Sequence, residues 1–218
     1  MKKVVLFLTL ILSITALFGC KSQKDFNEYI SQLRYDVLFA ENDLCSISCY
    51  LETRESPFVS DGIVNAKENL VILKLSPKND ELKDFGVSFT TDKTYTENFS
   101  FEPRFNCYVA TVSVETMPSK NLKITLSDEN GNSDITLTSK KQSSTISYDK
   151  ALSFVYSQNK EKIDDLISSD DNFEINLRLI SEEQDFWFVG ITTSENSFCF
   201  LVDGKSGKII AQKNINNI

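Results

Sequence analysis

The chain has 218 residues, of which 41% are hydrophobic and 25% charged, with a formal net charge of -8 at pH 7. These fractions are typical of a folded globular protein. An acidic chain without a basic stripe does not suit nucleic acid, because phosphate recognition depends on clustered Lys and Arg. The absence of histidine excludes Ser-His-Asp and Cys-His nucleophile pairs, an HExxH zinc site and an imidazole general base.

Other catalytic chemistry finds no support in the sequence pattern. Carboxylate-pair or lysine chemistry remains open in principle, but nothing in the sequence positions such groups. The seven glycines form no phosphate-binding loop. We therefore expect a protein that is not an enzyme, with no catalytic residue, no metal site and no cofactor.

The N-terminus has the three parts of a secretory signal: two lysines after Met1, an apolar run over residues 4–18, and a small residue before the expected cleavage site. A transmembrane helix needs about 20 apolar residues, so the run is short for a span. The quartet "LFGC", ending at Cys20, resembles the lipobox of bacterial lipoproteins.

The lipobox resemblance implies a signal peptide over residues 1–19 and a Cys20 that is diacylated on sulfur and becomes the mature N-terminus. The mature chain then has 199 residues and a formal charge of -10. Two acyl chains are sufficient for stable anchoring. The expected location is the extracytoplasmic face of the cell membrane, with the membrane as a partner through Cys20. The alternative is a plain signal peptide or an uncleaved anchor.

A short amphipathic helix is predicted within residues 20–42, directly after the anchor. The apolar residues Phe26, Tyr29, Ile30, Leu33 and Val37 recur at helical spacing. We expect this helix to dock on a sheet.

The apolar period changes to two from residue 44 onward, which predicts β-strands. The predicted strands are Leu44–Leu51, Asn69–Leu75, Gly86–Thr90, Tyr108–Glu115, Leu122–Ser127 and Ile135–Thr138. Clean alternation and the absence of intervening helices predict an antiparallel β-sandwich of immunoglobulin-like type over residues 43–140. The Cys-Trp-Cys hallmark of that family is missing, so the strand topology stays open.

The four remaining cysteines are Cys45, Cys49, Cys107 and Cys199. Cys45 and Cys49 lie four residues apart in a predicted strand, about 13 Å along it, whereas a disulfide needs Cα atoms within about 7 Å. They cannot pair with each other. Whether the cysteines pair elsewhere stays open, and free buried thiols are the favoured interpretation.

The loop "TRESPFVSDG", residues 53–62, is the candidate binding segment. It brings Arg54, Glu55, Phe58 and Asp61 close together in sequence, and loops on rigid scaffolds often carry recognition. The alternative is a simple connection, in which Arg54 pairs with a neighbouring carboxylate and Phe58 covers the edge of the core.

The turn "SDENGNSD" offers a weak match to a calcium loop. Asp128, Asn130 and Asn132 match its first three odd positions, but serines occupy the glycine and glutamate positions. Asn130–Gly131 is instead a signal for a two-residue hairpin turn, which we favour.

A second unit is predicted over residues 145–218, after a polar, serine-rich boundary between Ser139 and Ile146. Ser147 is a candidate N-cap for a helix that continues to about Ile167. The four strands predicted after it are Phe173–Ile180, Phe186–Thr192, Phe198–Val202 and Lys208–Gln212. This order predicts a small α+β unit.

The helix start "IS..KA", the strand "FWFVGI" and the closing hairpin "FLVDGKSGKII" resemble the PepSY domain over about the last 70 residues. In the hairpin, Asp203, Gly204 and Gly207 match the family pattern and serve the turn. The resemblance implies a binding or regulatory module for an envelope protein, such as a peptidase. The acidic residues of the "KIDDLISSDD" segment would then face a cationic partner or form a solvated helix end.

Two classes of function follow from these patterns. The first is a surface-tethered, non-catalytic binding module that contacts an envelope protein. The second is a solute-binding lipoprotein, whose usual two-lobed architecture needs repeated strand-helix units that this sequence lacks. The first class is therefore preferred.

Overall fold

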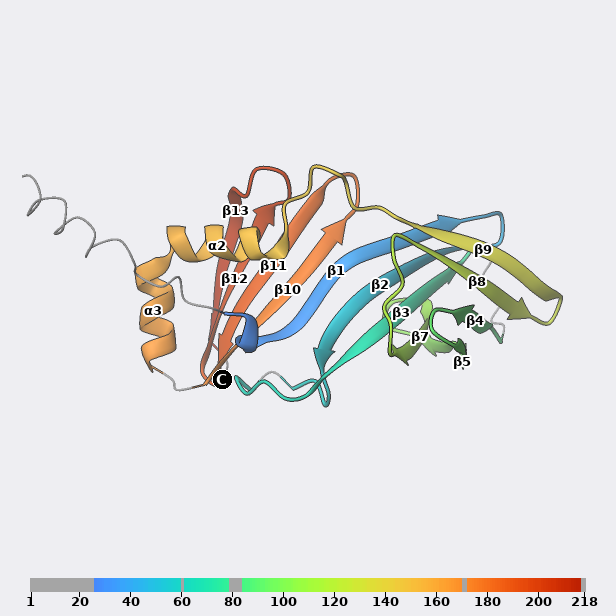
Figure 1. Ribbon diagram of the computed structural model, residues 1–218, viewed down its shortest axis with the longest axis horizontal. Coiled ribbons are helices and arrows are strands. Elements are labelled where there is room, and N and C mark those ends of the chain that lie inside the picture. The colour runs from blue at the N-terminus through green and yellow to red at the C-terminus, as the bar shows by residue number, and fades with distance from the viewer. Residues whose placement is uncertain (1–25, 60, 79–83, 170–171, 217–218) are drawn as a thin grey trace, which may run out of the picture.

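One long β-sheet, with strands from both ends of the sequence, is the central feature of the computed structural model, which describes residues 26–59, 61–78, 84–169 and 172–216 (Figure 1). The fold is mainly antiparallel β with two short α-helices, and at this level the sequence prediction is confirmed. The elements are η1 (Asn27–Tyr29), β1 (Ile30–Glu41), β2 (Cys45–Glu55), β3 (Lys67–Pro77), β4 (Gly86–Thr90), β5 (Thr94–Asn98), β6 (Ser100–Glu102), β7 (Cys107–Val114), β8 (Asn121–Asp128), β9 (Gly131–Ser139), α2 (Tyr148–Gln158), α3 (Lys160–Ser169), β10 (Phe173–Ser181), β11 (Asp185–Thr193), β12 (Asn196–Asp203) and β13 (Ile209–Asn216).

The nine strands of the long sheet run in the order β13-β12-β11-β10-β1-β2-β3-β7-β6. Neighbours are antiparallel except β1 and β10, which are parallel. The other four strands branch from β1 through β9 and continue as β8, β4 and β5. They form a second layer over the β1–β7 end of the sheet (Figure 1).

Two hydrophobic cores lie on the same face of the long sheet. One core packs β1, β2, β3 and β7 against the second layer, and the other packs α2, α3 and η1 against β10 to β12. Strand β2 links the two cores. Leu51 belongs to the first core, and Thr53, two residues further on the same face of β2, pairs with Leu33 at the second core. We call the opposite face of the long sheet the open face, because neither core lies on it, although some of its side chains, such as Glu52 and Leu70, are buried.

The helix predicted within residues 20–42 is wrong over the described residues. One 3₁₀ turn, η1, is followed directly by the twelve-residue strand β1. Register shifts between Ile30 and Gln32 and between Arg34 and Asp36 place inward-facing residues three apart instead of two. This spacing imitates a helical period, and pairing on both edges of the strand decides the outcome. Residues 20–25 lie outside the described residues.

The predicted strands of both units are confirmed within a few residues of their ends, but β5 and β6 were not predicted. Ser147 caps α2 as expected, since its Oγ accepts from the backbone N–H of Lys150. The predicted long helix is divided at Asn159 into α2 and α3. In the β8–β9 hairpin Asp128 pairs with Gly131, so Glu129 and Asn130 form the turn, one residue earlier than expected.

The polar segment 140–147 is held to the C-terminal unit by side chains of β11. Asp185 accepts hydrogen bonds from the backbone N–H of Gln142 at 2.8 Å and from the Thr145 hydroxyl. Trp187 Nε1 donates to the Ile146 carbonyl at 3.0 Å. Whether residues 43–140 and 145–218 fold as two separate units stays a prediction. Within the part of the chain described by the structure, no helix is long and apolar enough to cross a membrane.

Candidate functional site

Two of the four predicted binding residues come together on the open face. The guanidinium carbon of Arg54 lies 5.5 Å from the ring centroid of Phe58, within reach of a cation–π contact. Arg54 also lies 3.6 Å from a carboxylate oxygen of Glu52. Phe58 is 40% exposed, so its ring is available to a partner.

The other two predicted residues have local partners and do not join this contact. Glu55 is buried and faces away from the open face, and its Oε2 accepts from the backbone and side-chain nitrogens of Asn65 at 2.8 and 3.3 Å. Asp61 accepts from the backbone N–H of Ile63 at 2.9 Å, which closes a turn. Their hydrogen bonds shape the loop.

Arg54 belongs to a larger group on the open face, which we call the arginine cluster: Arg34, Arg54 and Arg178 with Glu52 and Gln32. The chain has four arginines, and the cluster contains three of them. Strand register brings them together, because Arg34 pairs with Arg178 of β10 on one side and with Glu52 of β2 on the other. Gln32 pairs with Arg54 two residues further along β1 and β2, on the same face.

Glu52 is the centre of the cluster and has no exposed surface. Its Oε2 accepts from Arg34 Nε at 3.1 Å and lies 3.0 Å from the second guanidinium nitrogen. Its Oε1 accepts from Gln32 Nε2 at 2.6 Å. Hydrogen bonds to a charged group of this kind are stronger than those between neutral groups.

Arg178 is less well compensated than the other two arginines. Its Nε donates to Gln32 Oε1 at 2.6 Å, and its guanidinium carbon lies 5.2 Å from the Phe188 ring centroid. Among the described residues, no carboxylate lies within 4.0 Å of it. Burial, and then the positive charge of Arg34, lower the pKa of Arg178.

Further hydrogen bonds lie beside the cluster, toward the start of β10. Ser31 Oγ donates to Asn176 Oδ1 at 3.2 Å, and Asn176 Nδ2 donates to Glu174 Oε1 at 3.0 Å. Glu174 is fully buried. The carboxylates of this region are thus hidden, whereas the side chains of Arg34 and Arg54 remain 21% and 30% exposed.

A cavity of about 290 Å³ lies at the end of the sandwich, beside the β8–β9 turn. Its apolar lining includes Leu44, Phe85 and Leu126. It is near the lower limit of the volumes that small-ligand sites occupy, about 300 Å³.

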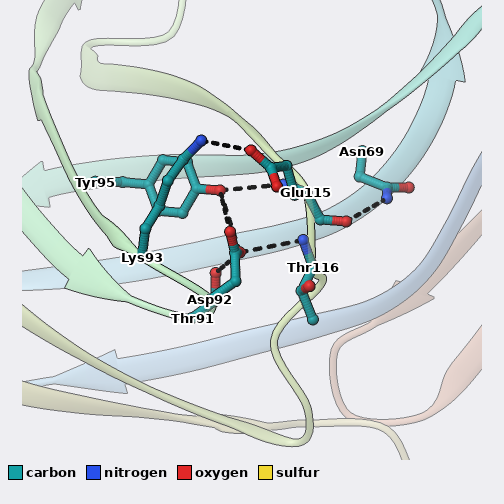
Figure 2. A network of polar contacts seen from close by, with 7 residues as sticks. All are labelled: Asn69, Thr91, Asp92, Lys93, Tyr95, Glu115 and Thr116. Atoms are coloured by element: carbon teal, nitrogen blue, oxygen red, sulfur yellow. Dashed lines mark hydrogen bonds and ion pairs between the residues drawn. The ribbon is translucent and has the colours of Figure 1, made fainter.

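A second polar network joins the two layers of the sandwich (Figure 2). The Tyr95 hydroxyl donates to Asp92 at 3.2 Å and accepts from the Glu115 backbone N–H at 3.1 Å. Asp92 also accepts from Thr91 Oγ1 at 2.8 Å, and this hydrogen bond is the main reason that the pKa of Asp92 is lowered. The contacts tie the β4–β5 turn to the end of β7, which gives the network a structural role.

The cysteines and acidic residues offer no evident reactive centre in the described chain. Cys45, Cys49, Cys107 and Cys199 are all free thiols, and the first three are buried, as the favoured interpretation expected, whereas Cys199 is half-buried. Burial is the main cause that raises the pKa of Cys49. No group of three His, Cys, Asp or Glu within the described ranges is arranged to hold a metal ion.

The arginine cluster was not predicted, because its members lie far apart in sequence. Arg34 falls in the segment predicted as a helix, and Arg178 lies in a predicted strand on the far side of the sequence. The available signal was the alternation of "EINLRLI", which places Glu174, Asn176 and Arg178 on one face of a buried strand. Comparisons with protein-family models, with curated proteins and with solved structures found no match.

Proposed function

We propose that this chain is a membrane-tethered, non-catalytic binding module of a bacterial cell envelope, and that its C-terminal unit receives an extended segment of an envelope protein along strand β13. Main-chain pairing to an open sheet edge is an established mode of peptide recognition and needs no catalytic residue.

The observation that carries this proposal is the open edge of β13. Among the described strands β13 pairs only with β12, at one end of the long sheet. Residues 210–215 are all exposed, including Ile210 at 47% and Ile215 at 40%. The strand contains no proline or glycine and one charged residue, Lys213, so it lacks most of the features that block edge pairing.

The other open edges are shorter. Strand β6, at the far end of the long sheet, has three residues, and β5, at the edge of the second layer, has five. Two other described strands are partly paired on one edge: β9 is unpaired toward β1 over residues 131–137, and β7 is unpaired beyond β6 over residues 110–114. With eight residues, β13 offers the most backbone to an extended partner.

The order of elements in the C-terminal unit supports the PepSY-like part of the proposal. Two helices precede four antiparallel strands, and the helices pack on one face of the sheet (Figure 1). On this proposal the immunoglobulin-like sandwich is the platform, lipidated Cys20 is the tether, and the partner is an envelope protein such as a peptidase. Cys20 lies outside the described residues.

The main experiment maps the contact on the full ectodomain, residues 21–218. A protein captured from envelope extract is purified, and amide hydrogen exchange of the ectodomain is measured with and without it. We expect the backbone amides of β13 to become protected, while those of β5 serve as the internal control. Protection confined to the sandwich, with β13 unchanged, would overturn the assignment.

Two further experiments test the tether and the lack of turnover. Cys20→Ser should abolish fatty-acid labelling and release the protein from the membrane fraction, because no thiol remains to be acylated. Peptide, glycan and ester substrates should be hydrolysed no faster than with a folded control protein. Reproducible turnover would contradict the non-catalytic assignment.

The small-ligand alternative is favoured only by the apolar cavity of about 290 Å³ beside Leu44. Native mass spectrometry of the ectodomain distinguishes small-ligand binding from protein binding. A copurifying small molecule that is lost in Phe85→Ala would favour the alternative.

A further inference from the structure

We propose that the crevice between β1 and β10 is a binding site for an oxyanion, the carboxylate or phosphate group of a small ligand, held by Arg34, Lys140 and Tyr50. This site is independent of the β13 edge.

The crevice exists because β1 changes its neighbour part-way along. Its first residues pair with β10 as far as Arg34 and Arg178, and its later residues Leu38 and Phe39 pair with β9. Where β1 and β10 separate, they leave a cavity of about 210 Å³. This volume is below the roughly 300 Å³ at which small-ligand sites begin, so it suits a single anionic group with a few attached atoms.

The wall of the cavity carries two cations. Arg34 binds Glu52 through Nε and one terminal nitrogen, and no described residue accepts a hydrogen bond from its other terminal nitrogen. Lys140 is exposed, and its Nζ lies 4.3 Å from the Phe39 ring centroid with no carboxylate of the described chain within 4.0 Å. Both cations can therefore still pair with an anion.

Besides apolar residues such as Val37 and Ile180, the lining includes two side chains with neutral donors. Tyr50 and Ser48 also line this cavity, and no described residue is hydrogen-bonded to the hydroxyl of either. The Arg34 guanidinium stacks 4.3 Å above the Tyr50 ring, which fixes the position of both groups. Two cations and two hydroxyl donors are the groups that carboxylate and phosphate oxygens accept from.

The local charge balance also favours an anion. Arg178, which neighbours Arg34 in the parallel pair, has no carboxylate within reach among the described residues, so Glu52 is the sole close counter-charge for the arginine cluster. The nearest further acid on β10, Glu174, is bonded to Asn176. Among the described residues, the only acid that lines the cavity is Glu182, which is exposed to solvent, where water screens its charge.

The test titrates the ectodomain at constant ionic strength, with chloride as the background anion. The soluble probes are inorganic phosphate and acetate, and vesicles containing phosphatidylglycerol form a separate arm. Binding is followed by two-dimensional amide NMR. We expect saturable shifts for residues of the crevice with at least one soluble probe.

Variants locate the site. Lys140→Gln and Tyr50→Phe each remove one donor without touching Glu52, and each should weaken binding about tenfold, which corresponds to about 1.4 kcal/mol. The matched control is Arg104→Gln, because Arg104 is the fourth arginine, is 86% exposed and lies outside the cluster. It should bind as the unmodified protein does.

Three results would overturn the proposal. They are the absence of saturable shifts with both soluble probes, an equal loss of affinity in Arg104→Gln and Lys140→Gln, and binding to anionic vesicles alone. The last result would indicate a diffuse surface attraction in place of a defined site.

Discussion

Replacing Glu52 with glutamine should destabilise the fold strongly. Glutamine keeps the shape of the side chain but removes the one carboxylate that engages Arg34 and Arg54. Glu52 has no exposed surface, so Arg34 and Arg54 would lose a fully desolvated counter-charge, and their own exposure of 21% and 30% would let water offset only part of that loss. Breaking a buried ion pair on one side costs about 3–5 kcal/mol, a large part of the roughly 5–15 kcal/mol that stabilises a typical domain.

The assay is urea unfolding followed by tryptophan fluorescence, with far-UV circular dichroism as the second probe. Trp187 is the single tryptophan of the chain and is completely buried, so its emission reports loss of the C-terminal core. In thermal unfolding followed by the same two probes, Tm should fall by about 6–20 °C, at about 2–4 °C per kcal/mol for a chain of this size.

The matched control for Glu52→Gln is Glu115→Gln. Glu115 also pairs with a cation, at 2.6 Å from Lys93, but the two side chains are 73% and 56% exposed. Exposed pairs contribute about 0–1 kcal/mol. If Glu52→Gln lost no more free energy of unfolding than this control, the description of the cluster as buried and tightly balanced would be refuted.

Three further outcomes are expected. Tyr95→Phe removes a hydroxyl with two partners (Figure 2) and should lower the free energy of unfolding in urea by about 1–2 kcal/mol, whereas an unchanged midpoint would show that the network contributes nothing. Asp185→Ala removes the hydrogen bonds from Gln142 and Thr145 that hold segment 140–147, so limited proteolysis should cut this segment faster than in the unmodified chain. Equal cutting rates would show that these hydrogen bonds do not hold the segment. Burial raises the pKa of Tyr35 to about 12, so the unfolded chain loses the phenol proton first as pH rises. The free energy of unfolding should therefore fall between about pH 10 and 12, and a constant free energy over this range would contradict the raised pKa of Tyr35.

Much of the fold could be predicted because alternation of apolar residues reports a half-buried strand directly. The segments around Val112 and Ile124 alternate cleanly, and both are strands with inward apolar residues. The strand β5, "TYTEN", has one buried residue, Tyr95, so it gives almost no periodic signal. In β1 two register shifts change the period itself, which local pattern alone cannot distinguish from a helix.

The site could be predicted only where its residues are neighbours in sequence. Arg54 and Phe58 were identified from one loop, and they do lie together. Arg34 and Arg178 become neighbours through a parallel strand pair that no local signal reveals. The crevice between β1 and β10 depends on the same parallel pairing, so it could not be predicted from the sequence either.

The parallel pairing of β1 with β10 also constrains the order in which the molecule can assemble. Ser31 and Asn176 are hydrogen-bonded but lie 145 residues apart, and closing so long a loop is entropically more costly than closing a hairpin. In a chain delivered N-terminus first, β1 can pair early with β2 along one edge and with β9 at Leu38 and Phe39 on the other edge, while the first part of that second edge, residues 30–34, stays unpaired until β10 is made. Strands β10 to β13 can then be added to this edge, and we expect the pairing of β10 with β1 to be the slow step of folding. A fragment that starts near residue 145 lacks strand β1, with which β10 pairs. A fragment that ends there lacks the C-terminal core residues that pack on Ile30 and Leu33.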